Sequence, residues 1–132
     1  MAELPSRAQV VIIGGGVIGT SVAYHLTKLG WTDVLLLEQG SLSGGTTWHA
    51  AGLVGPLRAT ESGTRLVQYS AELYAALEAE TGLATGYRPV GGVIVERTED
   101  RMMARRRTAA NAVAYDMECR MLSPDEAGEL WP

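Results

Sequence analysis

The sequence predicts an α/β fold organised around a strand–helix–strand unit with parallel strands. Two apolar runs, residues 9–13 and 34–37, have the β-branched and leucine-rich composition of strands buried on both faces. Between them lie three glycines and a helical repeat of apolar residues, which is the order of a crossover connection. Together these observations predict two neighbouring strands that run in the same direction, joined by a right-handed crossover.

The elements follow one another with recognisable boundaries. The first strand is the run Gln-Val-Val-Ile-Ile at residues 9–13. A helix is predicted over residues 17–29, because apolar residues recur there at helical spacing. Gly30 follows the helix, where a left-handed cap is expected. The second strand is predicted at residues 34–37.

The second half of the chain has less regular signals. Residues 40–63 are rich in Gly, Ser and Thr without a period, and so long a stretch is usually functional or disordered. An apolar face from Leu66 onwards predicts a helix that ends before Gly82. Residues 91–96 are predicted to form a strand with a glycine entry, and residues 101–117 a further helix.

The last element carries a capping-box pattern. Ser123 is a cap residue, Pro124 stands at the first helical position and Glu126 at the third. A helix is therefore predicted to start at Ser123 and to be interrupted by the end of the chain at Pro132. Only about three strands are predicted, whereas a typical sheet has about five or six. We expect the chain to be the N-terminal fragment of a larger protein.

Composition excludes several classes of protein. The 132 residues carry a net charge of −4, which gives no reason to expect a nucleic acid partner. The single cysteine excludes an intrachain disulfide, and no metal site is expected. No apolar run is long enough to span a bilayer, and no secretory signal or mitochondrial presequence is recognisable. A bacterial cytoplasmic protein is expected, with the mitochondrial matrix as the less favoured location.

The glycines after the first strand form the pattern G-x-G-x-x-G. Gly14 permits a tight turn, Gly16 lets a pyrophosphate approach the backbone, and Gly19 lets helix and strand pack closely. The N–H groups near Val17 and Ile18 would face the phosphates at the positive end of the helix dipole. The pattern predicts a dinucleotide site.

Glu38 supports that prediction from the end of the second strand. It lies about 20 residues after the glycines, where an acid accepts from a ribose hydroxyl and disfavours NADP. The alternative interpretation is a glycine-rich turn that binds nothing, with Glu38 simply solvated. It is disfavoured because strand, turn, helix, second strand and acid all occur in the order of the motif. The fold does not choose between NAD and FAD. A second turn at residues 43–47 offers backbone donors and hydroxyls. Together with the first glycine turn it could hold an extended dinucleotide from both sides, whereas a plain nicotinamide-binding domain would more often continue directly into another helix and strand.

A longer stretch carries a family resemblance. The run "VVIIGGGVIGTSVAYHLTKLGWTDVLLLEQGSLSGGTTWHAAGLV" resembles the N-terminus of FAD-dependent amine oxidoreductases related to D-amino-acid oxidase. The segments "SGGTTWHAAGLV", "YRPVGGVIV" and "LSPDEAGELWP" are similar to the group of dimethylglycine dehydrogenase, sarcosine dehydrogenase and 4-methylaminobutanoate oxidase. The resemblance covers nearly the whole chain, but only the first part of the family's length.

The resemblance implies a fold and a cofactor site. Residues 1–80 would form the N-terminal part of an incomplete Rossmann-like FAD-binding domain, and residues 81–132 the start of a β-rich substrate domain. In that family the matching histidine carries FAD covalently through the flavin 8α-methyl carbon, which implies the same role for His49. The residues implied at FAD are Gly14, Gly16, Val17, Ile18, Gly19, Glu38, Gln39, Gly45, Thr46, Thr47, Trp48, His49, Ala50, Ala51, Gly52 and Leu53.

The residue types around His49 are consistent with that role. A neutral imidazole nitrogen is a nucleophile near pH 7. Ala50, Ala51 and Gly52 let the backbone approach a flat ring, and Trp48 is expected to pack near that ring or in the core. Without the resemblance, a hydrogen-bonded loop histidine is the simpler interpretation.

The implied reaction is the oxidation of the C–N bond of a small N-methyl amine, with hydride transfer to the flavin. It would release formaldehyde, or pass the one-carbon unit to tetrahydrofolate in longer relatives, and oxygen or an electron-transfer protein would accept the electrons. The catalytic residues would lie beyond Pro132, so the 132-residue chain alone is expected to be inactive. Two alternatives stay open, a noncovalent-FAD amino-acid oxidase and a non-catalytic nucleotide-binding remnant.

Overall fold

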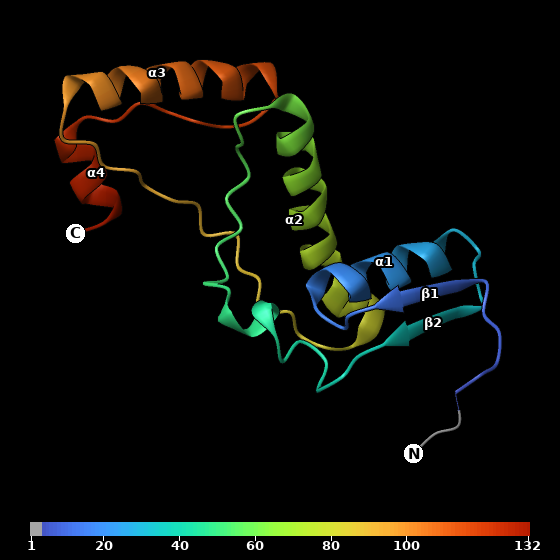
Figure 1. Cartoon of the computed structure of the whole chain (residues 1–132). Coiled ribbons are helices and arrows are strands. Elements are labelled where there is room, and N and C mark those ends of the chain that lie inside the picture. Colours follow the sequence, from blue (N-terminus) through green and yellow to red (C-terminus); the bar gives the residue numbers. More distant parts are fainter. Residues whose placement is uncertain (1–3) are drawn as a thin grey trace. The chain divides into compact units, whose positions relative to one another are not determined.

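The computed structural model describes residues 4–132 as two compact units that divide between Leu53 and Val54 (Figure 1). Within these residues the chain forms two strands, four α-helices and one short 3₁₀ helix. Among them no helix is long and apolar enough to cross a membrane.

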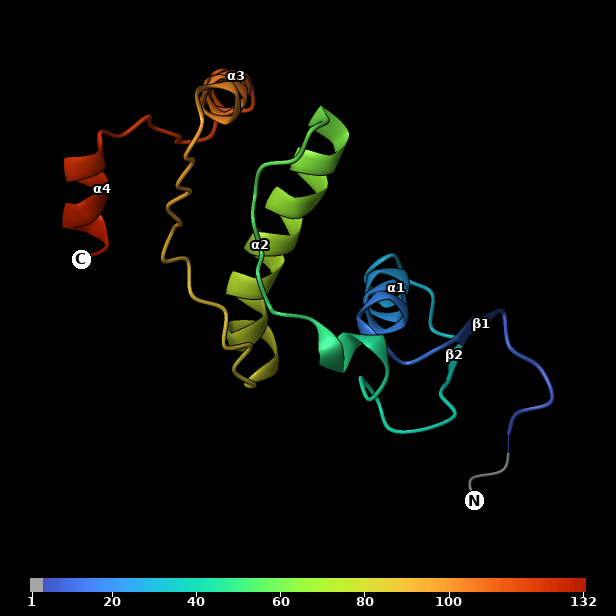
Figure 2. The same cartoon turned by 60° about the vertical axis from the view of Figure 1, so that its left-hand side comes forward.

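The first unit is the strand–helix–strand arrangement that the sequence predicts. Strands β1 (Val10–Ile13) and β2 (Val34–Leu37) are parallel, with Val10 opposite Val34 and Ile13 opposite Leu37. Helix α1 (Val17–Lys28) connects them and contacts both strands, and Figure 2 shows it nearly end-on beside the pair. The predicted α/β class is confirmed, and β1 begins one residue later than expected.

Helix α1 ends as the glycine after it predicts. The N–H of Leu29 donates to the carbonyl of His25 at 3.0 Å, and Gly30 then takes a positive φ of 91°. Glycine adopts this left-handed conformation without the steric penalty that a Cβ brings. The chain is thereby turned back toward the start of β2.

The second unit contains α2 (Glu61–Thr81), α3 (Glu99–Ala114) and α4 (Pro124–Leu130). Each helix begins at a hydroxyl side chain that accepts a backbone N–H of the first turn, and these caps are Thr60, Thr98 and Ser123. Ser123 and Glu126 form the reciprocal capping box that the sequence predicts. Helix α4 begins at Pro124, as predicted, and extends to Leu130.

Residues 91–96 do not form the predicted strand. They lie outside any helix or strand, and Val90, Ile94 and Val95 are exposed. The β-branched composition is right, but a strand needs a neighbouring strand to accept and donate its backbone hydrogen bonds. In residues 4–132 the only paired strands are β1 and β2.

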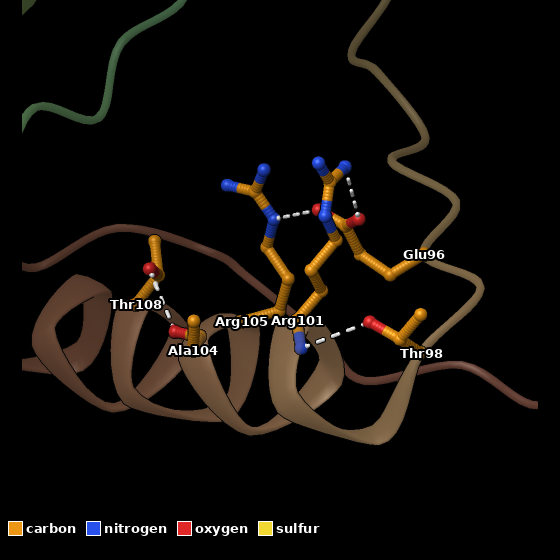
Figure 3. A network of polar contacts seen from close by, with 6 residues as sticks. All are labelled: Glu96, Thr98, Arg101, Ala104, Arg105 and Thr108. Carbon is orange, nitrogen blue, oxygen red and sulfur yellow. Dashed lines mark hydrogen bonds and ion pairs between the residues drawn. The ribbon is translucent and has the colours of Figure 1, made fainter.

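An ion-pair network ties the end of this segment to α3 (Figure 3). Nε of Arg105 donates to Oε1 of Glu96 at 2.6 Å, and Nη1 of Arg101 lies 3.6 Å from Oε2. The hydrogen bond from Arg105 holds the pKa of the largely buried Glu96 carboxyl below its usual range. Glu96 thus remains charged and anchors the chain at the start of α3.

Candidate dinucleotide site

The turn between β1 and α1 has glycines where other atoms come close to its backbone. The N–H of Gly14 donates to the carbonyl of Leu37 at 2.8 Å, and Gly14 takes a φ of 105° that disfavours any side chain. At Gly19 a Cβ would overlap the carbonyl oxygen of Gly14. The third glycine of the motif therefore lets the first turn of α1 lie directly against the loop.

Glu38 closes this turn from the end of β2. Its Oε2 accepts the N–H of Gly15 at 2.7 Å, and its Oε1 accepts the N–H of Gly40 at 2.8 Å. The N–H of Gly15, followed by that of Gly40, holds the pKa of the Glu38 carboxyl below its ordinary range. Each carboxylate oxygen has a further lone pair, so Glu38 is able to accept a ligand hydroxyl as well.

An open pocket of about 250 Å³ lies beside this carboxylate. Glu38, Gln39 and Gly45 line it together with the intervening loop backbone. These are residues for which the sequence implies contact with the adenosine ribose and the pyrophosphate. The Glu38 carboxylate at the edge of the pocket is negatively charged and has free lone pairs. It therefore suits the hydroxyl groups of a ribose better than an additional phosphate on that ribose.

We expect the contribution of Glu38 to stability to disappear in acid. Because its pKa is lowered in the folded state, the carboxylate stabilises the fold above the ordinary glutamate range, about pH 4.3, and loses that effect as the pH falls through the lowered value. Glu38→Gln should lower the melting temperature at pH 7, and the difference from wild type should shrink steadily toward pH 3. Thermal melts of both proteins across this range check it, and a constant difference would contradict it.

The second loop is fastened to the first by two hydrogen bonds. The N–H of Ser43 donates to the carbonyl of Gly15 at 2.9 Å, and the N–H of Val17 donates to Oγ1 of Thr47 at 2.9 Å. A Cβ at Gly16 would lie 2.9 Å from the same hydroxyl oxygen. Gly16 therefore makes room for Thr47, in addition to the phosphate approach that the motif predicts.

Sequence analysis assigned no role to Gly15 or Gly40, and it included Ser43 only as part of the turn at residues 43–47. Gly15 is buried and is tied to both Glu38 and Ser43, and a Cβ there would lie 2.5 Å from Cδ2 of Leu42. Ser43 has a positive φ of 61°, which is uncommon outside glycine, and Gly40 donates to Glu38. The three consecutive glycines at 14–16 and the Ser-Gly-Gly run at 43–45 were the available signals.

His49 lies on a 3₁₀ turn in the long loop. The helix η1 (Thr46–His49) gives local structure to part of the stretch predicted to be irregular. Nδ1 of His49 lies 3.0 Å from the carbonyl oxygen of Gly45. Because a carbonyl oxygen only accepts, Nδ1 carries the proton, and in the neutral ring the lone pair lies on Nε2. His49 and Trp48 are both exposed.

The remaining implied residues flank these contacts. Ile18 lies in the first turn of α1 and is 77% exposed. Ala50, Ala51, Gly52 and Leu53 follow η1 as exposed, irregular backbone, and Gly52 has a φ of 75°. The structure thus brings the glycine turn, Glu38 and Thr47 together, while residues 50–53 extend away from η1.

The residues present fit a dinucleotide. The N–H groups of Ile18 and Gly19 lie in the first turn of α1, where an α-helix offers them no carbonyl partner. They stand beside a turn with no side chains at Gly14, Gly15 and Gly16, and beside an ionised carboxylate. No cluster of three or more metal-binding side chains occurs in residues 4–132. The fold and this site define a dinucleotide-binding α/β protein.

The chain belongs to the FAD dependent oxidoreductase family, which matches residues 9–132. It is 43% identical to the mitochondrial pyruvate dehydrogenase phosphatase regulatory subunit of Mus musculus, over 98% of this chain and 15% of that protein. It is 41% identical to the mitochondrial sarcosine dehydrogenase of Mus musculus, over 98% of this chain and 14% of the relative. It is 40% identical to the formaldehyde-forming 4-methylaminobutanoate oxidase of Paenarthrobacter nicotinovorans, over 98% of this chain and 16% of the relative.

These similarities confirm the predicted family and its narrower group. The chain spans only 14–16% of the length of these relatives. Among solved structures, L-proline dehydrogenase from P. horikoshii superimposes with a TM-score of 0.86 at 23% identity, covering 96% of this chain and 33% of that chain. That superposition shows a shared fold.

Proposed function

We propose that this chain supplies the N-terminal part of the FAD site of an oxidoreductase acting on the C–N bond of a small N-methyl amine. The observation that carries the proposal is the similarity over nearly the whole chain to a sarcosine dehydrogenase and a 4-methylaminobutanoate oxidase. The side-chain-free glycine turn and the Glu38 carboxylate, which accepts the N–H of Gly15, also support the proposal. Tetrahydrofolate, and oxygen or an electron-transfer protein, are the proposed acceptors of the one-carbon unit and of the electrons.

The residues of this chain bind and orient the cofactor in this proposal. Bound FAD supplies the chemistry by accepting a hydride equivalent from the amine carbon. The N–H groups of Ile18 and Gly19 hold the pyrophosphate, and Glu38 accepts from the adenosine ribose. No residue of the chain is assigned to abstract a proton or to bind the amine.

His49 is the proposed point of covalent attachment. Its hydrogen bond to Gly45 determines which ring nitrogen is free to bond to the flavin. Nδ1 donates to Gly45, so the lone pair of the neutral ring lies on Nε2. Nε2 of His49 would hold the flavin through its 8α carbon. The flavin would supply an electrophilic methyl group there, and dioxygen would accept the two electrons and two protons released, one hydrogen from the methyl group and one from the imidazole.

A non-catalytic role is the second candidate. The specific observation that favours it is the 43% identity to a protein whose name describes it as a regulatory subunit. Such a role would use the same dinucleotide site without turnover.

The two candidates differ in their response to amines. The natural polypeptide that contains this sequence, purified at full length, should be mixed without oxygen with sarcosine, dimethylglycine or 4-methylaminobutanoate. We expect at least one of these to bleach the visible flavin absorbance, and formaldehyde to appear once air is admitted. Glycine, which lacks the N-methyl group, is the matched control, and the isolated residues 1–132 should give no turnover. A flavin that no N-methyl amine bleaches would favour the regulatory role.

A further inference from the structure

The contact between the second loop and helix α1 suggests a task for Thr47 that rests on the proposed function. We propose that the Thr47 hydroxyl is a positioning group for covalent attachment of FAD at His49. It would act through the backbone, by holding η1 on the first N–H of α1, and would take no part in the bond-forming step.

Two hydrogen bonds connect the imidazole to helix α1. Nδ1 of His49 lies 3.0 Å from the carbonyl of Gly45, at the start of the turn that carries both residues. Oγ1 of Thr47 accepts the N–H of Val17 at 2.9 Å. The imidazole is thus fixed to η1, and η1 is fixed to the first residue of α1, where the glycine turn ends.

Backbone bonds make η1 a stiff connection between Thr47 and His49. The N–H of Trp48 donates to Gly45 at 3.1 Å, and the N–H of Ala50 donates to Thr47 at 3.2 Å. Thr47 and His49 stand two residues apart in this single 3₁₀ turn, so a displacement of one moves the other. Without the Thr47 hydroxyl, the bond from Ser43 to Gly15 is the remaining backbone tie described above between the two loops.

Bond formation depends steeply on this placement. A misplacement of about 1 Å between reacting groups costs up to roughly 100-fold in rate. The N–H of Val17 is exposed, so water replaces the lost hydroxyl without leaving a buried donor unsatisfied. Removal of the hydroxyl should therefore slow attachment far more than it lowers stability.

The test separates attachment from binding. Apoprotein of the natural full-length polypeptide, made in riboflavin-starved cells, is given saturating FAD, and samples are denatured over time. Flavin that stays on the denatured protein is tethered, and flavin that is released was bound noncovalently. We expect Thr47→Val to slow tethering by roughly tenfold to 100-fold, when the rate is expressed per flavin that stays bound to the protein through gel filtration.

Two further variants complete the design. Thr47→Ser keeps the hydroxyl and should restore the wild-type rate. Thr27→Val is the matched control, because the Thr27 hydroxyl donates to the carbonyl of Tyr24 at 2.7 Å on the exposed far part of α1. It should tether at the wild-type rate.

The possible failures are distinguishable. Tethering of Thr47→Val at the wild-type rate would overturn the inference and leave the proposed function intact. A folded Thr47→Val protein that binds no flavin at all would also overturn it, because Thr47 would then be needed for binding itself. A wild-type protein with flavin that is always released on denaturation would instead overturn attachment at His49.

Discussion

Replacement of His49 by alanine is expected to abolish covalent flavin and to leave the fold intact. The side chain is exposed, and the one hydrogen bond it makes in the described structure is that from Nδ1 to Gly45. Surface substitutions of this kind change stability by about 0.5 kcal/mol or less. The effect on attachment is total, because alanine offers no nucleophile to the 8α carbon.

The measurement is flavin fluorescence of the denatured full-length protein on a gel, with mass analysis of the peptide that contains residue 49. His25→Ala is the matched control, since His25 is the other histidine of the chain and lies within α1. The control should stay fluorescent. Retained fluorescence in His49→Ala would show that another residue carries the flavin.

The second large effect is expected from Gly19→Ala. An alanine inside an exposed helix normally stabilises it by about 0.5–1 kcal/mol relative to glycine. At Gly19 the added methyl overlaps the carbonyl oxygen of Gly14, a backbone atom that cannot rotate away. Overpacking of this kind costs about 1–3 kcal/mol or more, so the steric term outweighs the helix preference and α1 must move away from the glycine turn.

Gly19→Ala should therefore lower both the melting temperature and the flavin content of the purified protein, with FAD affinity reduced by roughly tenfold or more. Gly128→Ala is the matched control, because it also places alanine in a helix but meets no atom within 4 Å. This control should be as stable as wild type or slightly more so. Wild-type flavin content in Gly19→Ala would contradict the close approach seen at this turn.

Local signals account for most of what the sequence predicts correctly. The strands β1 and β2, the stop at Gly30 and the capping box at Ser123 each depend on residues adjacent in the chain. The α2 and α3 boundaries differ by a few residues from the predicted ones, because the caps Thr60 and Thr98 precede the first apolar positions.

Features that depend on distant partners were predicted less well. Residues 91–96 have a composition suited to a strand. Whether they form one depends on a second strand to which their backbone can hydrogen-bond, and the segment's own residues do not reveal such a partner. The bond from Val17 to Thr47 joins residues 30 positions apart, across a loop with no hydrophobic period. The glycine motif and the family resemblance implied that both residues lie near the cofactor, but neither contained information about their contact.

The exposed segment at residues 90–95 has a consequence for handling the isolated chain. This segment has four β-branched residues and two glycines without charge or proline, and it is able to stack with copies of itself because it is exposed and belongs to no strand. Arg88 and Pro89 precede the run, and Glu96 and Arg97 follow it, which is the placement of gatekeeper residues that discourage aggregation. Solubility of the isolated chain in concentrated samples should therefore depend on the charges that flank this run.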